Sequence, residues 1–481
     1  MLSYRSVALL AISLVVASIP PAFGEVAIGG RITLADEGFE GARVVLLPLD
    51  GRYQAGRALM DGEAGAEPVD ETRTDGDGRF RLEAPEPGGW TVRVEAPDHL
   101  PAEAILRPLV EANELPTLEL EAAQAMVVRI AGRGGEDRDD EDRDDGDVTR
   151  IAVEPPAQRQ WQRSLGGWAT PVRLAQTDAD GVARLPVAAG EKVVLWADVP
   201  GSPRLRREVR AGKGVTLKPL GGIEHRVRVT VGRRGVAKAL IFGKRGIIPL
   251  ALTDSEGRAT LTAPTDSALT LLALGPEGHR GSHSLEPPRE DEPAREETIE
   301  LAEPDWLSGQ VVEHETRRPI PGAWMWQHRV DSDLVRTDAR GGFRVPVPET
   351  ATNFGAIALG YAAGGAAWQR SESSDLTLVL HPSASLSGVV VDSAGRPVGA
   401  AEAWLVVHRT AETRRSLRWF QRWLSRGEGP VTRSTRDGRF RLAGLPAGAS
   451  YHLTWVKAGF VPTPVKIEPL EAFEHRDRLR M

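Results

Sequence analysis

Hydrophobic and polar residues alternate with a period of two over many short segments, and glycine, proline or aspartate bounds most of these segments. In residues 79–84, for example, Phe80 and Leu82 lie two residues apart, with an arginine on each side of Phe80. Such alternation puts the apolar side chains on one face of a β-strand. Because a sheet with one apolar face must cover it, we predict an all-β chain of two-sheet sandwiches.

One turn recurs five times, as TDGDGRFRL, TDADGVARL, TDSEGRATL, TDARGGFRV and STRDGRFRL. The repeats are about 90 residues apart, which is the size of a small independent domain. We therefore predict a tandem array of five Ig-like or transthyretin-like antiparallel β-sandwich domains, called modules 1 to 5. Their predicted ranges are residues 25–122, 123–220, 221–303, 304–381 and 382–481.

The first copy of the turn contains Asp75 and Asp77, which raises the question of a calcium site. A shared site would need acidic oxygens at fixed places in the loop. The place of Asp77 is taken by Arg340 in the fourth copy, and that of Asp75 by Thr435 in the last. Within the loop only a glycine is common to all copies, and glycine is what a turn with positive φ requires. We predict a tight turn and keep Asp75 and Asp77 as weak metal candidates.

The N-terminus resembles a secretion signal, because Arg5 precedes an apolar stretch at residues 7–19 and small residues follow at Ala22 and Gly24. We expect a signal peptide over residues 1–24, cleaved near Gly24, and a periplasmic or extracellular protein. An uncleaved anchor or a buried N-terminal element are the alternatives. The chain has no cysteine and a net charge of −7. Stability must therefore come from hydrophobic cores, and we expect no nucleic-acid partner.

The last copy carries a family resemblance in SGVVVDSAGRPVGAA and STRDGRFRLAGLPAGASYHLTWVKAGF. It is similar to the carboxypeptidase regulatory-like domain, a transthyretin-like (prealbumin-like) sandwich of about seven strands. The fourth copy matches in Ser308, Gly309, Pro319 and Phe343, and the first in Gly30, Gly78, Phe80 and Trp90. The resemblance implies an accessory module of exported bacterial proteins, with a carbohydrate-binding-like shape and no catalytic residue. In the last copy the matching positions are Ser387, Gly388, Gly395, Pro397, Val398, Asp437, Gly438, Phe440, Leu442, Leu445, Pro446, Gly448, Tyr451 and Gly459.

The sequence contains no nucleophile elbow, no H-E-x-x-H motif and no phosphate-binding G-K-[ST] loop. His279 and His283 have the spacing of a metal pair on a helix, but the surrounding glycines and prolines favour an exposed loop. We therefore predict a protein that is not an enzyme and has no cofactor. An enzyme of unidentified type remains the least favoured alternative.

A strongly acidic stretch, EDRDDEDRDDGD, occupies residues 136–147 in module 2. Such a run is typical of a solvated loop that repels itself. The alternative is a low-affinity divalent-cation site. Its ligands would be Asp139, Asp140, Asp142, Asp144 and Asp145.

Trp326 and Trp404 fall at equivalent places in modules 4 and 5. If Val44, Met325 and Ala403 point into their cores, both tryptophans point outward. Outward tryptophans could pack one module against its neighbour, which we favour, or stack on sugar rings.

The sequence AETRRSLRWFQRWLSRGEGP in module 5 has helical periodicity, and we predict an inserted amphipathic helix over residues 411–426. Leu417, Phe420 and Leu424 share one face. The helix could pack on its own sandwich, or it could contact an anionic membrane surface or an acidic partner. The residues of that second alternative are Arg414, Arg415, Arg418, Trp419, Arg422, Trp423 and Arg426.

These features together predict an exported, non-enzymatic protein that binds, spaces or holds other components at the bacterial cell envelope. Short linkers indicate a semi-rigid rod of touching modules. Its partner would be an envelope protein or a polysaccharide. A carbohydrate-binding protein that uses Trp326 and Trp404 is the main alternative.

Overall fold

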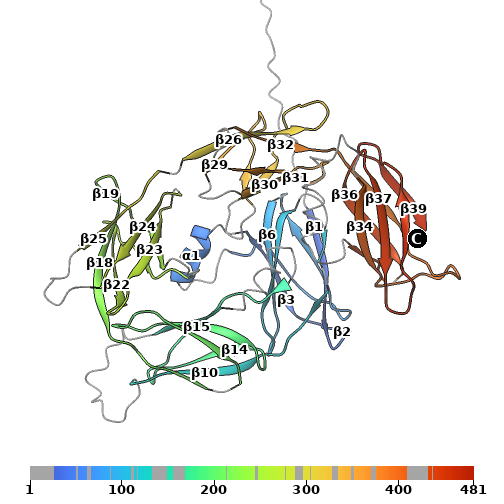
Figure 1. Ribbon diagram of the computed structural model, residues 1–481. Coiled ribbons are helices and arrows are strands. Elements are labelled where there is room, and N and C mark those ends of the chain that lie inside the picture. Colours follow the sequence, from blue (N-terminus) through green and yellow to red (C-terminus); the bar gives the residue numbers. More distant parts are fainter. Residues whose placement is uncertain are drawn as a thin grey trace, which may run out of the picture.

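The computed structural model shows a chain of short β-strands with a single α-helix among the residues it describes (Figure 1). The fold class is the one that the alternation predicts, a tandem array of β-sandwiches. The structure describes residues 26–480 apart from the segments 50–51, 62–66, 87, 110–112, 116, 133–148, 155–167, 213, 244–247, 277, 288–295, 304, 328–333, 348–351, 370–374, 409–431 and 436.

Module 4 shows the topology in its simplest form. One sheet has the order β29-β26-β32, and the facing sheet has the order β28-β27-β30-β31. β26, the first strand, pairs antiparallel with β29 and parallel with β32, the last strand, so this smaller sheet is mixed rather than purely antiparallel. The strands are β26 (Trp306–Glu313), β27 (Trp324–Gln327), β28 (Val335–Arg336), β29 (Gly342–Pro346), β30 (Thr352–Ile357), β31 (Gly364–Trp368) and β32 (Asp375–Leu380).

The other four modules repeat this plan, including the parallel pairing of first and last strands. Modules 2 and 3 therefore share the topology of modules 1, 4 and 5, although their turns lack the aromatic residue.

The strands of module 1 are β1 (Val26–Leu34), β2 (Glu37–Gly38), β3 (Arg43–Pro48), β4 (Asp70–Arg73), β5 (Arg79–Ala84), β6 (Gly88–Glu95), β7 (Ala102–Leu109), β8 (Asn113–Glu114) and β9 (Leu118–Glu119), and α1 (Arg52–Asp61) lies between β3 and β4. Those of module 2 are β10 (Gln124–Ile130), β11 (Arg150–Glu154), β12 (Trp168–Ala169), β13 (Arg173–Gln176), β14 (Val182–Val187), β15 (Lys192–Asp198), β16 (Leu205–Arg210) and β17 (Val215–Leu217).

Module 3 contains β18 (Gly222–Val231), β19 (Arg234–Gly235), β20 (Leu240–Gly243), β21 (Ala251–Leu252), β22 (Arg258–Pro264), β23 (Leu269–Leu274), β24 (Arg280–Leu285) and β25 (Glu296–Glu300). Module 5 contains β33 (Ser383–Val389), β34 (Glu402–His408), β35 (Thr432–Arg433), β36 (Arg439–Pro446), β37 (Ser450–Val456), β38 (Thr463–Ile467) and β39 (His475–Arg480).

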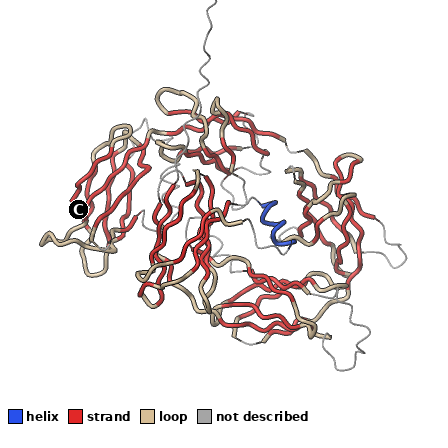
Figure 2. Tube along the Cα trace, turned by 180° about the vertical axis from the view of Figure 1, so that it is seen from behind, coloured by secondary structure: helices blue, strands red, loops and turns tan. Residues whose placement is uncertain are grey.

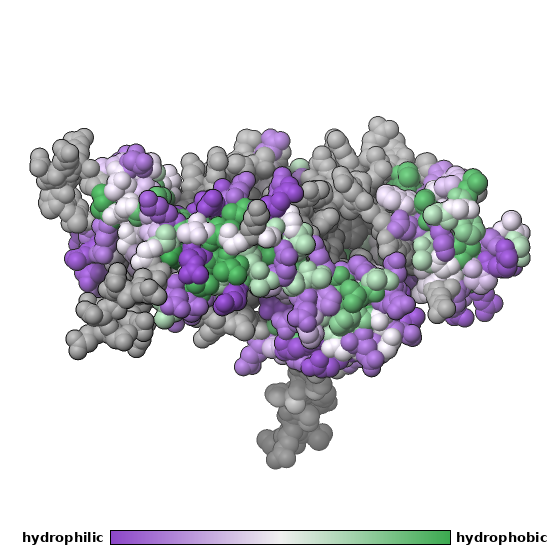
Figure 3. All heavy atoms as spheres, turned by 90° about the horizontal axis from the view of Figure 1, so that it is seen from below, coloured by the Kyte–Doolittle hydropathy of each residue, from purple (hydrophilic) through white to green (hydrophobic). Residues whose placement is uncertain are grey.

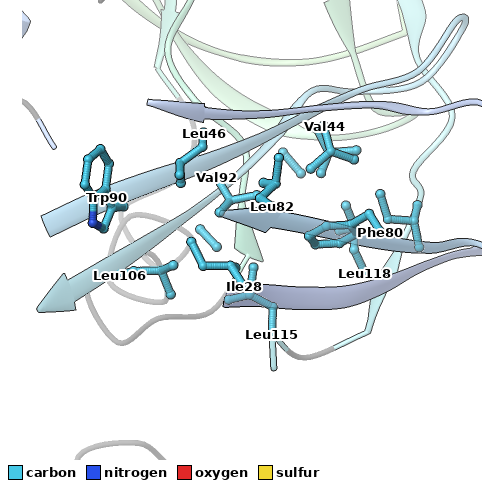
Figure 4. Close-up of a cluster of buried hydrophobic side chains, with 14 of the residues drawn as sticks. Ile28, Val44, Leu46, Phe80, Leu82, Trp90, Val92, Leu106, Leu115 and Leu118 are labelled. Atoms are coloured by element: carbon cyan, nitrogen blue, oxygen red, sulfur yellow. The ribbon is translucent and has the colours of Figure 1, made fainter. Parts of the chain in front are cut away.

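Each module has its own hydrophobic core between its two sheets. In module 1, Ile28, Phe80, Leu82 and Val92 meet between the sheets (Figure 4), and β5 shows strict alternation of exposed and buried side chains. Period-two alternation places every second side chain of a strand in the core between the two sheets.

The modules are not arranged as a rod. In both views, modules 1 to 4 follow one another around a closed circuit with α1 inside it, and module 5 lies outside the circuit (Figures 1 and 2). Contacts between modules that are not neighbours in sequence hold this arrangement, as described below. The predicted semi-rigid rod is therefore wrong, whereas the predicted contact between neighbouring modules is confirmed.

The described helix is not the one that the sequence predicts. α1 belongs to module 1, and its ten residues include Gly56 in the middle. The predicted helix over residues 411–426 lies outside the described residues, as do the predicted signal peptide over residues 1–24 and the acidic stretch 136–147.

Candidate interaction sites between the modules

The recurring turn has one geometry in all five modules. Its glycines, Gly78, Gly181, Gly257, Gly341 and Gly438, all have φ between 69° and 80°. In four copies the aspartate after the threonine accepts backbone amides. In module 1, Asp75 Oδ1 accepts from the amides of Asp77 at 3.0 Å and Arg79 at 2.8 Å. The same arrangement in module 3 lowers the pKa of Asp254, chiefly through the amide of Arg258.

These contacts explain the aspartates without a metal ion, since Asp75 is an acceptor within its own turn. Among the described residues, no group of three His, Cys, Asp or Glu side chains could hold a metal ion. The predicted tight turn is what the backbone shows, and metal binding by Asp75 and Asp77 has no geometric support.

The first residue of the repeated sequence is also structural, which the sequence analysis missed. The buried hydroxyl of Thr253 accepts from the amide of Ala239 at 2.8 Å and donates to the carbonyl of Val236 at 2.7 Å. We call this side chain the latch hydroxyl, because it ties the turn to the start of the second strand. The signal was visible, since every copy begins with threonine or serine. The equivalent residues are Thr74, Thr177, Thr337 and Ser434.

In each module, a connecting segment joins the second long strand to the short strand that pairs with it, for example β27 to β28 in module 4. In modules 1 to 4 this segment contacts another module. We call this segment the crossing segment. In module 1 it contains α1, which packs on the outer face of the module 3 sheet against Leu240, Phe242 and Leu274. The hydroxyl of Tyr53 donates to the carbonyl of Lys238 at 2.6 Å. An added Cβ at Gly56 would lie 2.8 Å from Leu240 and 3.2 Å from Phe242, so a larger residue would have to displace these side chains or the helix.

The crossing segments of modules 2 and 4 both reach module 1. In module 2, β12 pairs antiparallel with β7, where Trp168 is opposite Ala104. In module 4, Leu334 approaches Gly89, whose added Cβ would lie 2.2 Å from its side chain. An ion pair of 3.6 Å between Arg336 and Glu86 lies at the same junction.

The crossing segment of module 3 contacts module 2 through Arg204, which shares the carboxylate of Asp198 with Arg150. Arg204 donates to the carbonyl of Ile248 at 2.6 Å and pairs with Asp198 at 2.5 Å. Asp198 also pairs with Arg150 at 2.8 Å. Arg150 in turn donates to the carbonyl of Leu59 at 3.0 Å, near the C-terminal end of α1. Arginine is suited to this place, because the last carbonyls of a helix lack intrahelical donors and carry partial negative charge.

A single outward position shows how the modules use their sheet faces. It lies on the second long strand, three residues after the residue whose backbone amide donates to the latch hydroxyl. In modules 1 to 5 it is occupied by Val45, Ala152, Phe242, Trp326 and Trp404. In the first four modules this side chain is 0–5% exposed, whereas Trp404 is 41% exposed. At this position the outer sheet face is therefore covered in modules 1 to 4 and open in module 5.

Trp326 and Trp404 both point out of their cores, but they differ in exposure. Val44, Met325 and Ala403 are buried in their cores, as predicted. Trp326 points out of its core, as expected, but it is buried against Leu334, Ile357 and Ala363 of its own module, so the alternative in which it stacks on a sugar is wrong. Of these two tryptophans, only Trp404 is exposed. Figure 3 shows hydrophobic surface on the module at the right-hand end of the view, which is module 5.

The remaining predicted site residues divide into two groups. His279 precedes β24 and His283 lies on it, so His283 belongs to a strand and not to the exposed loop that was predicted. His283 pairs with Glu297 at 3.0 Å. Asp139, Asp140, Asp142, Asp144 and Asp145, and Arg414, Arg415, Arg418, Trp419, Arg422, Trp423 and Arg426, lie outside the described residues. In the part of the chain that the structure describes, no helix is long and apolar enough to cross a membrane.

One buried histidine is a candidate for pH sensitivity. The His381 ring stacks on His314 with the ring centroids 3.9 Å apart, and its Nε2 is buried without a hydrogen-bond partner in the described structure. Burial, followed by the charge of His314, lowers the pKa of His381 to about 4. At neutral pH both contacts therefore favour the uncharged ring.

No protein-family model and no curated protein sequence matches this chain. Among solved structures, it is similar to the Bacillus anthracis TIE protein, with 12% identity, 96% of this chain and 73% of that chain covered, and a TM-score of 0.16. It is also similar to the full-length RrgB pilus protein of Streptococcus pneumoniae, with 9% identity, 93% of each chain covered and a TM-score of 0.15. BcpA, the major pilin subunit of Bacillus cereus, has 9% identity, 95% and 98% coverage and a TM-score of 0.15. These scores are too low to carry an argument about function.

Proposed function

We propose that this chain is an exported, non-enzymatic scaffold protein of the bacterial cell envelope. The observation that carries the proposal is the use of the crossing segments, which in modules 1 to 4 all make contacts between modules. In a sandwich, connecting loops are the usual place for ligand-binding or catalytic groups. Here the described parts of four such loops serve the assembly of the chain itself.

The same proposal treats the five predicted ranges as domains of the carboxypeptidase regulatory-like type. Seven principal strands in module 4 and the repeated turn support this assignment. The closed circuit of modules 1 to 4 would act as a rigid body, and module 5 would project from it toward an envelope partner.

Cell fractionation tests the exported location and the scaffold role together. We expect a tagged full-length chain to appear in the envelope or external fraction, lacking residues 1–24 by mass spectrometry. In-cell crosslinking from photoreactive residues placed on module 5 should give a discrete adduct, and the same probe on β22 in module 3 should not. Recovery of the intact chain from the cytoplasm, or equal adducts from both probes, would contradict the proposal.

Carbohydrate binding is retained as a second candidate because Trp404 is exposed. A ring of this kind can stack on a sugar. The test is a polysaccharide pull-down that compares Trp404→Ala with Trp306→Ala, a matched control since Trp306 is 40% exposed in module 4. Loss of retention with Trp404→Ala alone supports a sugar site, and equal retention of both variants removes it.

A further inference from the structure

The open sheet face of module 5 lies where module 3 binds a helix. Trp404 and Val406 project from β34 and Val456 from the adjacent β37, and all three are exposed. In module 3 the position equivalent to Trp404 is Phe242, which α1 covers completely. The same fold position therefore accepts an amphipathic helix in one module and is uncovered in the described part of the other.

The end points of the module 5 crossing segment restrict its path. β34 ends at His408, and β35 begins at Thr432, which pairs with Ala403. The segment must therefore return five residues along β34, about 17 Å at 3.3 Å per residue.

The corresponding return in the other modules is shorter. In module 4, β27 ends at Gln327, and β28 begins at Val335, opposite Met325, so the segment returns by only two residues. The offset is also two in module 1, where β3 ends at Pro48 and Asp70 pairs with Leu46. A long return along the strand distinguishes module 5.

We propose that residues 411–426 dock as a helix on the outer face of their own module, over Trp404, Val406 and Val456. Sixteen helical residues span about 24 Å, enough to cover the 17 Å return. The face formed by Leu417, Phe420 and Leu424 matches the apolar surface that it would cover. This arrangement selects the packed alternative of the sequence analysis and identifies the surface involved.

The chain's own segment is favoured over the same segment of a second copy. Both ends of the segment are attached to the sheet that carries the face, which gives an effective concentration in the millimolar range. A second copy at micromolar concentration would be at a disadvantage of about a thousandfold. The docked segment is therefore an internal contact at ordinary protein concentrations.

Engineered cysteines provide a direct test in the full-length chain, because the natural sequence has no cysteine. Val406→Cys is combined in turn with Leu417→Cys, Phe420→Cys or Leu424→Cys, and the controls combine it with Arg418→Cys or Arg422→Cys on the opposite face. Under mild oxidation, at least one apolar-face pair should form an intramolecular disulfide at least tenfold faster than either control. Equal rates for both sets, or no disulfide in any pair, would overturn the proposal.

Limited trypsin digestion gives an independent readout. The double variant Trp404→Glu, Val406→Glu should be cleaved after the arginines of residues 414–426 at least fivefold faster than the natural chain, whereas the control Val461→Glu, at a site 88% exposed, should not be. Unchanged cleavage of the double variant would contradict docking. Disulfide-linked dimers, or a natural chain of twice 52.0 kDa by light scattering, would replace the internal contact with one between two copies.

The proposal goes beyond the scaffold role and does not depend on it. If the helix covers Trp404, this side chain cannot stack on a sugar. Binding to polysaccharide that is lost in Trp404→Ala would therefore argue against docking, and it would leave the proposed scaffold function unchanged. Failure of the disulfide test would likewise leave the fractionation result unchanged.

Discussion

The hydroxyl of Thr337 accepts a hydrogen bond from the backbone amide of Ala323 at 2.8 Å and donates one to the carbonyl of Ile320 at 2.9 Å. Both bonds are buried, and the same pair of bonds occurs at Thr74, Thr253 and Ser434. The latch hydroxyl thus joins the recurring turn, which precedes β29 in module 4, to the residues that precede β27. In these four modules, one side chain connects two separated parts of the sandwich.

The first prediction concerns this latch in module 4. Thr337→Val keeps the shape of the side chain but leaves the Ala323 amide and the Ile320 carbonyl buried without a partner, at a cost of about 1–3 kcal/mol. Hydrogen exchange of the Ala323 amide should become about 5- to 150-fold faster. Thr337→Ser is the matched control and should stay near the natural rate. Equal exchange in all three chains would show that the latch does not stabilise the module.

The second prediction separates two reasons for glycine in module 1. Gly78 and Gly41 both have positive φ, 75° and 82°. An added Cβ at Gly78 would lie 2.0 Å from the carbonyl oxygen of Ile32, whereas at Gly41 it would meet nothing within 4 Å. Gly41→Ala should therefore cost only the backbone strain, about 1 kcal/mol, and Gly78→Ala several kcal/mol more. Urea unfolding would show this difference, and similar losses for both variants would contradict the steric argument.

Local patterns in the sequence were sufficient to predict the sandwich fold and the tight turns. Alternation placed Val44, Met325 and Ala403 in their cores correctly, because the inner face of a strand depends only on its own module. The outer face depends on what lies against it. For this reason alternation gave the outward orientation of Trp326 and Trp404 but did not predict that the first is buried and the second exposed.

The closed circuit could not be predicted, because its contacts join residues far apart in sequence. The hydroxyl of Tyr53 reaches a carbonyl 185 residues away. α1 was missed for the same reason, since it is short, contains Gly56, and carries no acidic residue in its first turn and no basic residue in its last. A ten-residue helix of this kind depends on tertiary packing. The surface that stabilises α1 belongs to module 3, so the sequence of module 1 alone does not predict the helix.

The third prediction tests whether α1 holds the circuit closed. Gly56→Leu should push α1 away from Leu240 and Phe242 and expose Phe242, at a cost of about 2–3 kcal/mol. Ala55→Leu is the matched control, because Ala55 is exposed on the same helix. We expect a larger radius of gyration by small-angle X-ray scattering for Gly56→Leu only. An unchanged radius in both variants would mean that other contacts suffice to close the circuit.

The fourth prediction concerns the independence of the modules. A chain of residues 382–481 should unfold in one cooperative thermal transition, because the core of module 5 draws only on its own strands. A chain of residues 221–303 should be less stable than module 3 within the full protein, since it loses the α1 cover over Leu240 and Phe242. Absence of a transition in residues 382–481 would show that the boundaries are misplaced. Equal stability of module 3 alone and in the full chain would remove the role of α1.

The last prediction concerns acid sensitivity at the stacked histidines of module 4. His381 has an ordinary pKa of 6.5, and burial against His314 lowers it to about 4 in the folded chain. Between these values the unfolded chain binds a proton that the folded chain does not, so stability falls as the pH falls from about 6.5 to about 4. A shift of this size corresponds to a loss of at most about 3 kcal/mol, complete below pH 4.

Hydrogen exchange of the β32 amides measures this loss, and it should accelerate as the pH falls from about 6.5 to about 4, after correction for the intrinsic pH dependence. His381→Phe should remove the added sensitivity, and His279→Phe, at a half-exposed ring in module 3, should keep it. The same slope in the His381→Phe chain would show that other groups cause the acid sensitivity.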